Sequence, residues 1–87
     1  MVLSGKIIKN NRIINSATVE VSEEGLSFNL KLERAFLALC SALKIPIPMW
    51  LGKNTKEFAQ FRITFFTRDQ FTEDVNLERF EVELDSM

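Results

Sequence analysis

The sequence contains no histidine and no tyrosine, and Cys40 is its single cysteine. Histidine is the side chain that most often serves as a general base or as a metal ligand, so its absence removes the commonest route to both. One cysteine forms no disulfide within the chain and builds no thiolate zinc site, which needs four ligands. We therefore predict a protein that is not an enzyme, holds no metal, and works in the reducing cytoplasm.

Glycine and proline are also scarce, with three glycines far apart and two prolines close together. The glycines match neither the dinucleotide-binding fingerprint nor a phosphate-binding loop, so no cofactor is predicted. Long apolar runs are absent as well, because no stretch approaches the roughly 18 residues of a spanning helix. The N-terminus also lacks the apolar core of a signal peptide. We expect neither secretion nor insertion into a membrane.

Charge is nearly balanced overall but unevenly distributed along the chain. The net charge of -1 gives no general reason to expect a polyanionic partner. Residues 44–68 carry five basic side chains against one acidic, and residues 69–87 carry seven acidic against one basic. These segments could form a bipolar recognition surface. We expect them instead to pair with each other, because neighbouring antiparallel strands favour opposite charges across the pair.

The sequence pattern near the N-terminus predicts a β-hairpin. Pairs of isoleucines lie on both sides of Asn10 and Asn11, and asparagine tolerates the positive φ that a two-residue turn requires. In that register Ile8 faces Ile13 and Lys9 faces Arg12. The alternation that follows predicts a second strand with one packed face. We expect that face to carry Ile13, Ala17, Val19 and Val21.

The main helix is predicted over residues 30–43, where Leu, Ala, Glu, Lys and Arg dominate. Asn29 is its expected N-cap. Its middle, residues 35–40, is apolar all round, which predicts a helix covered on more than one side. Pro46 and Pro48 disfavour helical geometry in the residues before them and end the helix near Lys44.

The second half of the chain predicts one more short helix and two more strands. Asn54 and Glu57 have the spacing of a capping box, which starts a helix that runs to about Phe61. The β-branched and aromatic residues 62–67 predict a strand, and strict alternation over residues 80–85 predicts another. The chain is therefore expected to be one α+β domain, residues 1–87. In it an antiparallel sheet of about four strands, the N-terminal β-hairpin plus two C-terminal strands, packs on one main α-helix, with a short second helix.

The proline-containing segment 45–51, here called the strap, is the first candidate site. A strap stiffened by two prolines closes the core of a small domain at low entropic cost. Methionine and tryptophan are also enriched at the centres of protein interfaces. We favour core closure and keep an interaction surface as the second interpretation. The candidate surface residues are Ile47, Met49, Trp50 and Leu51.

The second candidate site is a basic and aromatic segment over residues 53–68. Basic grooves with stacking rings bind single-stranded nucleic acids, so nucleic-acid binding is an alternative function. The slightly negative net charge counts against it. The phenylalanines in this segment also have the spacing of a buried core. The candidate anion or nucleic-acid contacts are Lys53, Lys56, Arg62 and Arg68.

The leading hypothesis is a small, cytoplasmic, non-enzymatic protein–protein interaction module whose partner is a second copy of itself or another protein. It depends on the absence of catalytic residues. It also depends on the number of large apolar side chains, which exceeds what the core between one helix and a small sheet needs. Uncovered sheet edges also offer a route to pairing with a second chain. An enzyme that uses a carboxylate pair beside Trp50 is a further alternative. Cys40, inside an apolar helix with no histidine to activate it, is expected to be an inert packing residue.

Overall fold

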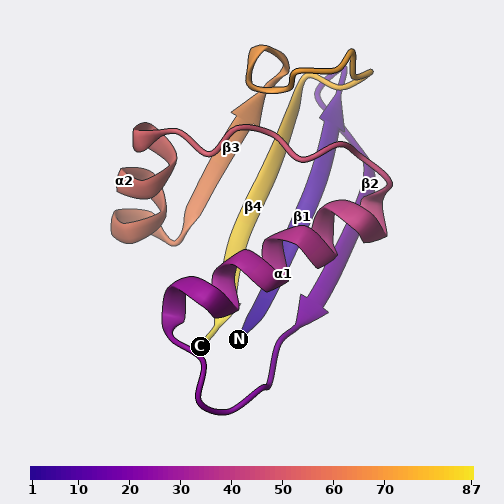
Figure 1. Cartoon of the computed structure of the whole chain (residues 1–87). Helices are drawn as coiled ribbons and strands as arrows, with labels where there is room; N and C mark the ends of the chain where they lie inside the picture. The colour runs from indigo at the N-terminus through magenta and orange to yellow at the C-terminus, as the bar shows by residue number, and fades with distance from the viewer.

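The computed structural model describes all residues, 1–87, and has the predicted α+β architecture. Four antiparallel strands form one sheet in the order β2-β1-β4-β3. Helix α1 lies across one face of this sheet, and α2 packs beside β3 at the edge opposite β2 (Figure 1). The elements are β1 (Val2–Lys9), β2 (Arg12–Glu20), α1 (Phe28–Leu43), α2 (Gly52–Phe61), β3 (Ile63–Thr67), a 3-10 helix η1 (Arg68–Gln70) and β4 (Arg79–Ser86).

The N-terminal hairpin has the predicted turn and the predicted pairs. Asn10 and Asn11 have φ values of 54° and 59°, the left-handed geometry of a two-residue turn between strands. Lys9 pairs with Arg12 and Ile8 pairs with Ile13. The turn chemistry of two asparagines is therefore enough to set the register next to the turn.

A β-bulge changes the register one step further along the hairpin. Asn15 pairs with Ile7 and Ile13 pairs with Ile8, so Ile14 has no partner of its own on β1. A shift of one residue moves a side chain to the other face of a sheet. Ile13 therefore lies on the face that α1 does not cover, and the expectation that it shares a face with Ala17 is wrong.

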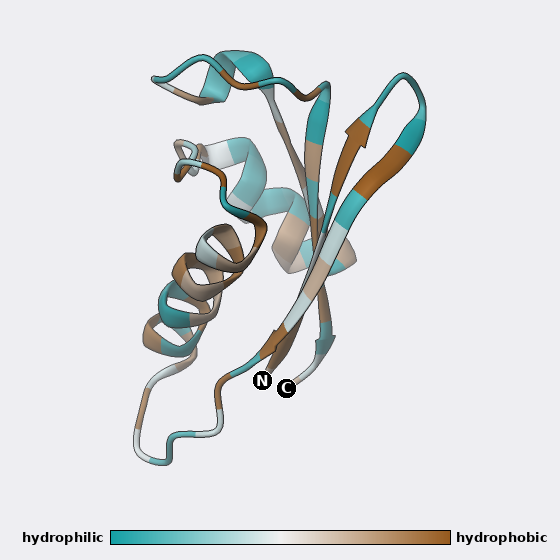
Figure 2. Ribbon diagram, turned by 90° about the vertical axis from the view of Figure 1, so that its right-hand side faces the viewer, coloured by the Kyte–Doolittle hydropathy of each residue, from teal (hydrophilic) through white to brown (hydrophobic).

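Helix α1 starts two residues before the predicted range and ends where the prolines predicted. The Ser27 hydroxyl accepts a hydrogen bond from the Leu30 N–H at 3.3 Å, so Ser27 rather than Asn29 is the N-cap. The prediction that the helix is covered on more than one side is wrong, since Leu37 is 42% exposed. The sheet lies along one side of α1 (Figure 2), and Trp50 of the strap packs on Phe36 beside it. The buried residues of α1 are Ala35, Phe36, Leu39, Cys40 and Leu43.

The core lies between α1 and the central strands β1 and β4. Phe66 and Phe80 are fully buried there, and their ring centroids are 5.8 Å apart. Phe36 of α1 adds a third ring, 5.3 Å from Phe66. Aromatic pairs at these separations contribute beyond the area that they bury. No helix of the structure has the length and the apolar composition needed to cross a membrane.

The close approach of α1 to the sheet depends on Gly5. A Cβ at Gly5 would lie 2.8 Å from Leu39 Cδ2 and 2.8 Å from Phe80 Cε1. Both neighbouring side chains are fully buried, so neither has free space to move into. The absence of a side chain at this position lets the helix sit directly on β1.

Gly5→Ala is therefore expected to lower the free energy of unfolding by about 1 to 3 kcal/mol, the usual cost of overpacking a core. Gly52→Ala is the matched control, because a Cβ at Gly52 meets nothing within 4 Å. The control should be as stable as the wild type or slightly more stable. Urea unfolding followed by Trp50 fluorescence measures both variants, and equal stability of the two would contradict this packing argument.

Candidate functional site

The strap crosses from the end of α1 to the start of α2 on the helix side of the sheet (Figure 1). Its backbone is held by Gln70, whose carbonyl accepts the Met49 N–H at 2.7 Å and whose side-chain nitrogen donates to the Met49 carbonyl at 3.1 Å. Alternate side chains point in opposite directions, so Pro48 is buried while Ile47 and Met49 are exposed. The strap is a fixed extended segment with one outward face.

Trp50 points inward and is part of the core wall. Its ring centroid lies 5.4 Å from that of Phe36, 5.5 Å from Phe66 and 5.6 Å from Phe58. Its indole N–H donates to the Thr55 hydroxyl at 2.9 Å. The structure thus separates Trp50 from the other three candidate surface residues. The outward side chains are Ile47, Met49 and Leu51, which are 56%, 46% and 41% exposed.

A buried polar network, here called the polar clamp, joins the strap to α2, β3 and η1. It consists of Asn54, Thr64 and Gln70, which are 0%, 0% and 1% exposed. The Asn54 side-chain oxygen accepts from the Leu51 N–H and from Gln70 Nε2, both at 2.9 Å. Its nitrogen donates to Thr64 Oγ1 at 2.8 Å and to the Phe65 carbonyl at 2.9 Å. No buried side-chain polar atom of the protein lacks a partner.

The polar clamp corrects the interpretation of the capping motif. Asn54 is the third residue of α2 rather than its N-cap, and Leu51 occupies the N-cap position. Glu57 instead accepts a hydrogen bond from Thr64 Oγ1 at 2.7 Å. Sequence reasoning found the helix but missed the clamp. The immediate sequence neighbours of Asn54 are polar, so no local pattern marked Asn54 as a buried residue.

The four candidate basic residues do not come together on one element. Lys53 and Lys56 belong to α2, while Arg62 and Arg68 lie at opposite ends of β3. Six residue steps along an extended strand correspond to roughly 20 Å. Arg68 also donates from Nε to the Leu77 carbonyl at 3.1 Å. The phenylalanines between these basic residues do not form one exposed stacking surface either, because Phe58 and Phe66 are buried.

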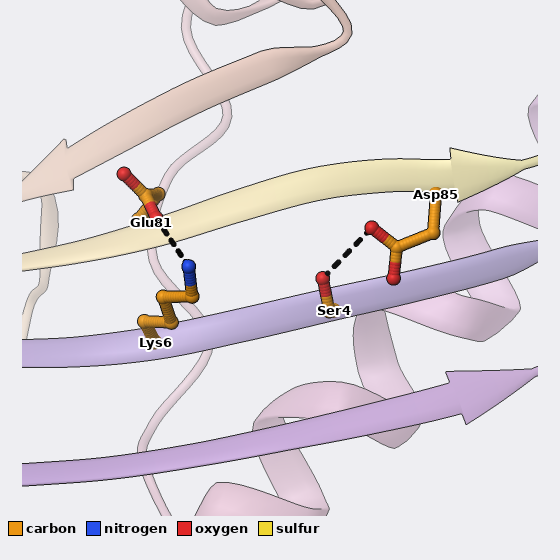
Figure 3. Close-up of polar contacts among 4 residues, drawn as sticks. All are labelled: Ser4, Lys6, Glu81 and Asp85. Carbon is orange, nitrogen blue, oxygen red and sulfur yellow. Dashed lines mark hydrogen bonds and ion pairs between the residues drawn. The ribbon is translucent and has the colours of Figure 1, made fainter. Parts of the chain in front are cut away.

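The two oppositely charged segments pair as antiparallel strands, β3 with β4, as expected, but no ion pair joins them. Lys6 of β1, which lies in neither segment, forms the ion pair with Glu81 of β4 at 3.7 Å (Figure 3). Ser4 donates to Asp85 at 3.2 Å on the same pair of strands (Figure 3). The strand next to β4 on the other side, β3, carries no charged residue. The acidic side chains of β4 therefore contact β1, because β1 is next to β4 in the sheet.

The outer edge of β2 is the longest free edge of the sheet. It covers nine residues, and its inner neighbour β1 is its only partner strand. Arg12 and Glu20 stand at its two ends, and neither takes part in an ion pair. The Ser16 N–H is bonded by the side-chain oxygen of Asn15 at 2.9 Å. Ile13 and Ile14 are 59% and 55% exposed next to this edge.

An apolar cleft of about 420 Å³ opens between the first turns of α1, the end of α2 and the end of β4. Phe28 and Leu32 line it from α1, and Phe58 and Ala59 line it from α2. Arg62 is the one charged residue in its wall. Sequence reasoning did not find this cleft, because its walls come from three segments that are distant in the chain.

Chemically reactive groups are few in this structure. Cys40 is buried in α1, and burial raises the pKa of its thiol from the ordinary 9.0 to about 11. The pKa of the exposed Asp69 carboxyl is lowered, first by the hydrogen bond from the Thr67 hydroxyl. No group of three or more His, Cys, Asp or Glu residues lies close enough together to hold a metal ion.

Comparisons with known proteins add no identification to this geometry. No protein-family model matches the chain, and neither the curated proteins nor the solved structures contain a match.

Asn54→Leu should lower the free energy of unfolding by about 2 to 4 kcal/mol, because it leaves the buried partners of the polar clamp with fewer hydrogen bonds. The same change at the exposed Asn76 is the control and should cost less than about 0.5 kcal/mol. Thermal and urea unfolding measure both. A stable Asn54→Leu variant would show that the polar clamp does not hold the strap.

Cys40 should react slowly with iodoacetamide at pH 8 in the folded protein and rapidly in denaturant, because burial keeps its thiol protonated and covered. Burial raises the pKa from 9.0 to about 11, so the unfolded chain loses this proton first as the pH rises. The contribution to stability is therefore complete below pH 9 and is lost between pH 9 and about 11. Cys40→Ala should lack this part of the pH dependence, and rapid labelling of the folded protein would contradict the assignment.

Proposed function

We propose that the protein is a non-enzymatic, cytoplasmic protein–protein association module that forms a symmetric homodimer through the edge of β2. The observation that carries the proposal is the self-complementary charge of that edge. Arg12 stands at one end and Glu20 at the other, and neither has an ionic partner within the chain. Two copies related by a two-fold axis would supply the missing partners.

Apart from the bulge at Ile14, the β2 edge lacks the features by which proteins normally protect a free edge. Natural edges are kept from pairing by short length, proline or charged side chains in the strand. β2 has nine residues, no proline, and no charged residue between Arg12 and Glu20. It therefore presents a row of free backbone donors and acceptors to a second strand.

Antiparallel pairing of two β2 strands centred near Ser16 brings Arg12 of each copy beside Glu20 of the other. The two-fold axis produces this pair twice, so one interface gains two favourable charge contacts. The exposed side chains of Ile13 and Ile14 lie next to the same edge and would be partly covered. The Asn15 side chain, which now bonds the Ser16 N–H, would give up that bond to the partner strand. The product is a continuous sheet of two protomers.

The strap offers a second surface of a different kind. Its outward side chains, Ile47, Met49 and Leu51, are apolar and sit on a backbone that Gln70 fixes. Apolar side chains on a fixed backbone suit an interface, because the backbone loses little conformational entropy on binding. We assign the β2 edge to self-association and leave the strap as the alternative site for another protein. Nucleic-acid binding through residues 53–68 has less support, because its basic residues lie on separate elements.

Charge reversal on β2 tests the dimer directly. The wild type should have the mass of a dimer by light scattering on a sizing column. Arg12→Glu alone, or Glu20→Arg alone, should weaken association about tenfold or more, because two attractive contacts become two repulsive ones. The double variant Arg12→Glu, Glu20→Arg should recover the dimer, since it restores both pairs with the charges exchanged.

The control for this experiment is a charge reversal away from β2. Lys56→Glu changes an exposed residue of α2 and should leave the mass unchanged. A monomeric wild type, or a double variant that fails to recover, would contradict the β2 interface. A dimer that Met49→Ser dissociates while both single reversals leave it intact would move the interface to the strap. Circular dichroism confirms that each variant is folded.

A further inference from the structure

We infer that the apolar cleft binds a small carboxylate with an apolar tail, and that Arg62 holds the carboxylate. Seven of the ten residues that line the cleft are hydrophobic. No acidic side chain is among them. A mainly apolar cavity with one fixed polar contact is the usual form of a small-molecule site. This site is independent of the β2 edge.

The position of Arg62 supports its role as the anchor. It follows α2 in the left-handed conformation, with φ of 60°, at the place where helices commonly end in glycine. Its carbonyl accepts the Leu84 N–H at 2.8 Å, which fixes its backbone against β4. Its guanidinium group takes part in no ion pair within the chain. A positive charge without a partner at the wall of an apolar cleft is complementary to a carboxylate.

A basic residue at the end of a helix is favourable by itself, because it interacts with the helix dipole. Lys44 occupies the same position after α1 and is also in the left-handed conformation, with φ of 56°. The helix dipole therefore explains the charge of Arg62 but not the apolar walls beside it. Phe28 and Leu32 of α1 reach the cleft from the other side, and their exposure leaves apolar surface that a ligand tail would cover.

The volume of the cleft limits the size of the ligand. A cleft of about 420 Å³ lies within the range of small-molecule sites, about 300 to 1,000 Å³. We commit to a free medium-chain fatty acid, because it combines one carboxylate with an apolar tail, and choose dodecanoate as the probe. A C-terminal apolar residue of a peptide presents the same chemistry but would fill only part of the volume.

Trp50 gives a direct readout, because the only tryptophan of the chain lines the cleft. Sodium dodecanoate, added below its micellar concentration, should change the Trp50 emission saturably with one ligand per chain. Arg62→Gln should raise the Kd at least about tenfold, the scale for a lost charge-assisted hydrogen bond. Dodecanol should bind the wild type and Arg62→Gln equally, because it carries no charge for Arg62 to hold.

Two further variants separate the site from general effects of charge and folding. Lys56→Gln removes a positive charge from α2, the helix that Arg62 follows. Lys56 does not line the cleft, so the Kd should be unchanged. Ala59→Leu fills the cleft from the surface of α2 and should weaken dodecanoate and dodecanol alike. Absence of a saturable change in the wild type would overturn the proposal, and so would equal binding of dodecanoate by Arg62→Gln. Tighter binding of a peptide with an apolar C-terminal residue would overturn the fatty-acid assignment.

Discussion

The polar clamp is the interaction on which the candidate surfaces depend. Asn54 uses all four of its hydrogen-bonding positions, and Gln70 links it to the strap. Buried amides that are fully paired specify one arrangement, because any other arrangement leaves a polar group without a partner in the core. The clamp sets where the strap lies and where α2 starts. Through those two elements it also positions Trp50 and the wall of the apolar cleft.

The one-sided covering of the sheet explains the distribution of surfaces. Both the strap and α1 lie on one side of the sheet (Figure 2), which leaves its other side uncovered. On that side the Lys6–Glu81 ion pair and the Ser4–Asp85 hydrogen bond connect the two central strands (Figure 3). The edge strand β2 has no such contact at Arg12 or Glu20. Charge is satisfied in the centre of the sheet and left free at its edge, where a second chain has access.

Much of the fold could be predicted from the sequence, whereas little of the candidate sites could. The four antiparallel strands, the main helix and the short second helix were all predicted. Of the sites, the strap was recognised but the direction of Trp50 was not, and the cleft beside Arg62 was missed. The two charged segments pair as β3 and β4, but their charges form no ion pairs. Strand order decides which charges are neighbours, and β1 lies between β2 and β4 although it comes first in the chain.

The sequence by itself determined the features that depend on local backbone chemistry. Asn10 and Asn11 accept positive φ and so close the hairpin, and the prolines after Lys44 stop α1. The tertiary structure alone decided the bulge that turns Ile13 to the open face, the inward direction of Trp50, the buried bonding of Asn54 and the position of Arg62 at the cleft. Apart from the bulge, which lies within the hairpin, each depends on contacts between segments that are distant in the chain. No local propensity encodes such a contact, because the partner is absent from the sequence window.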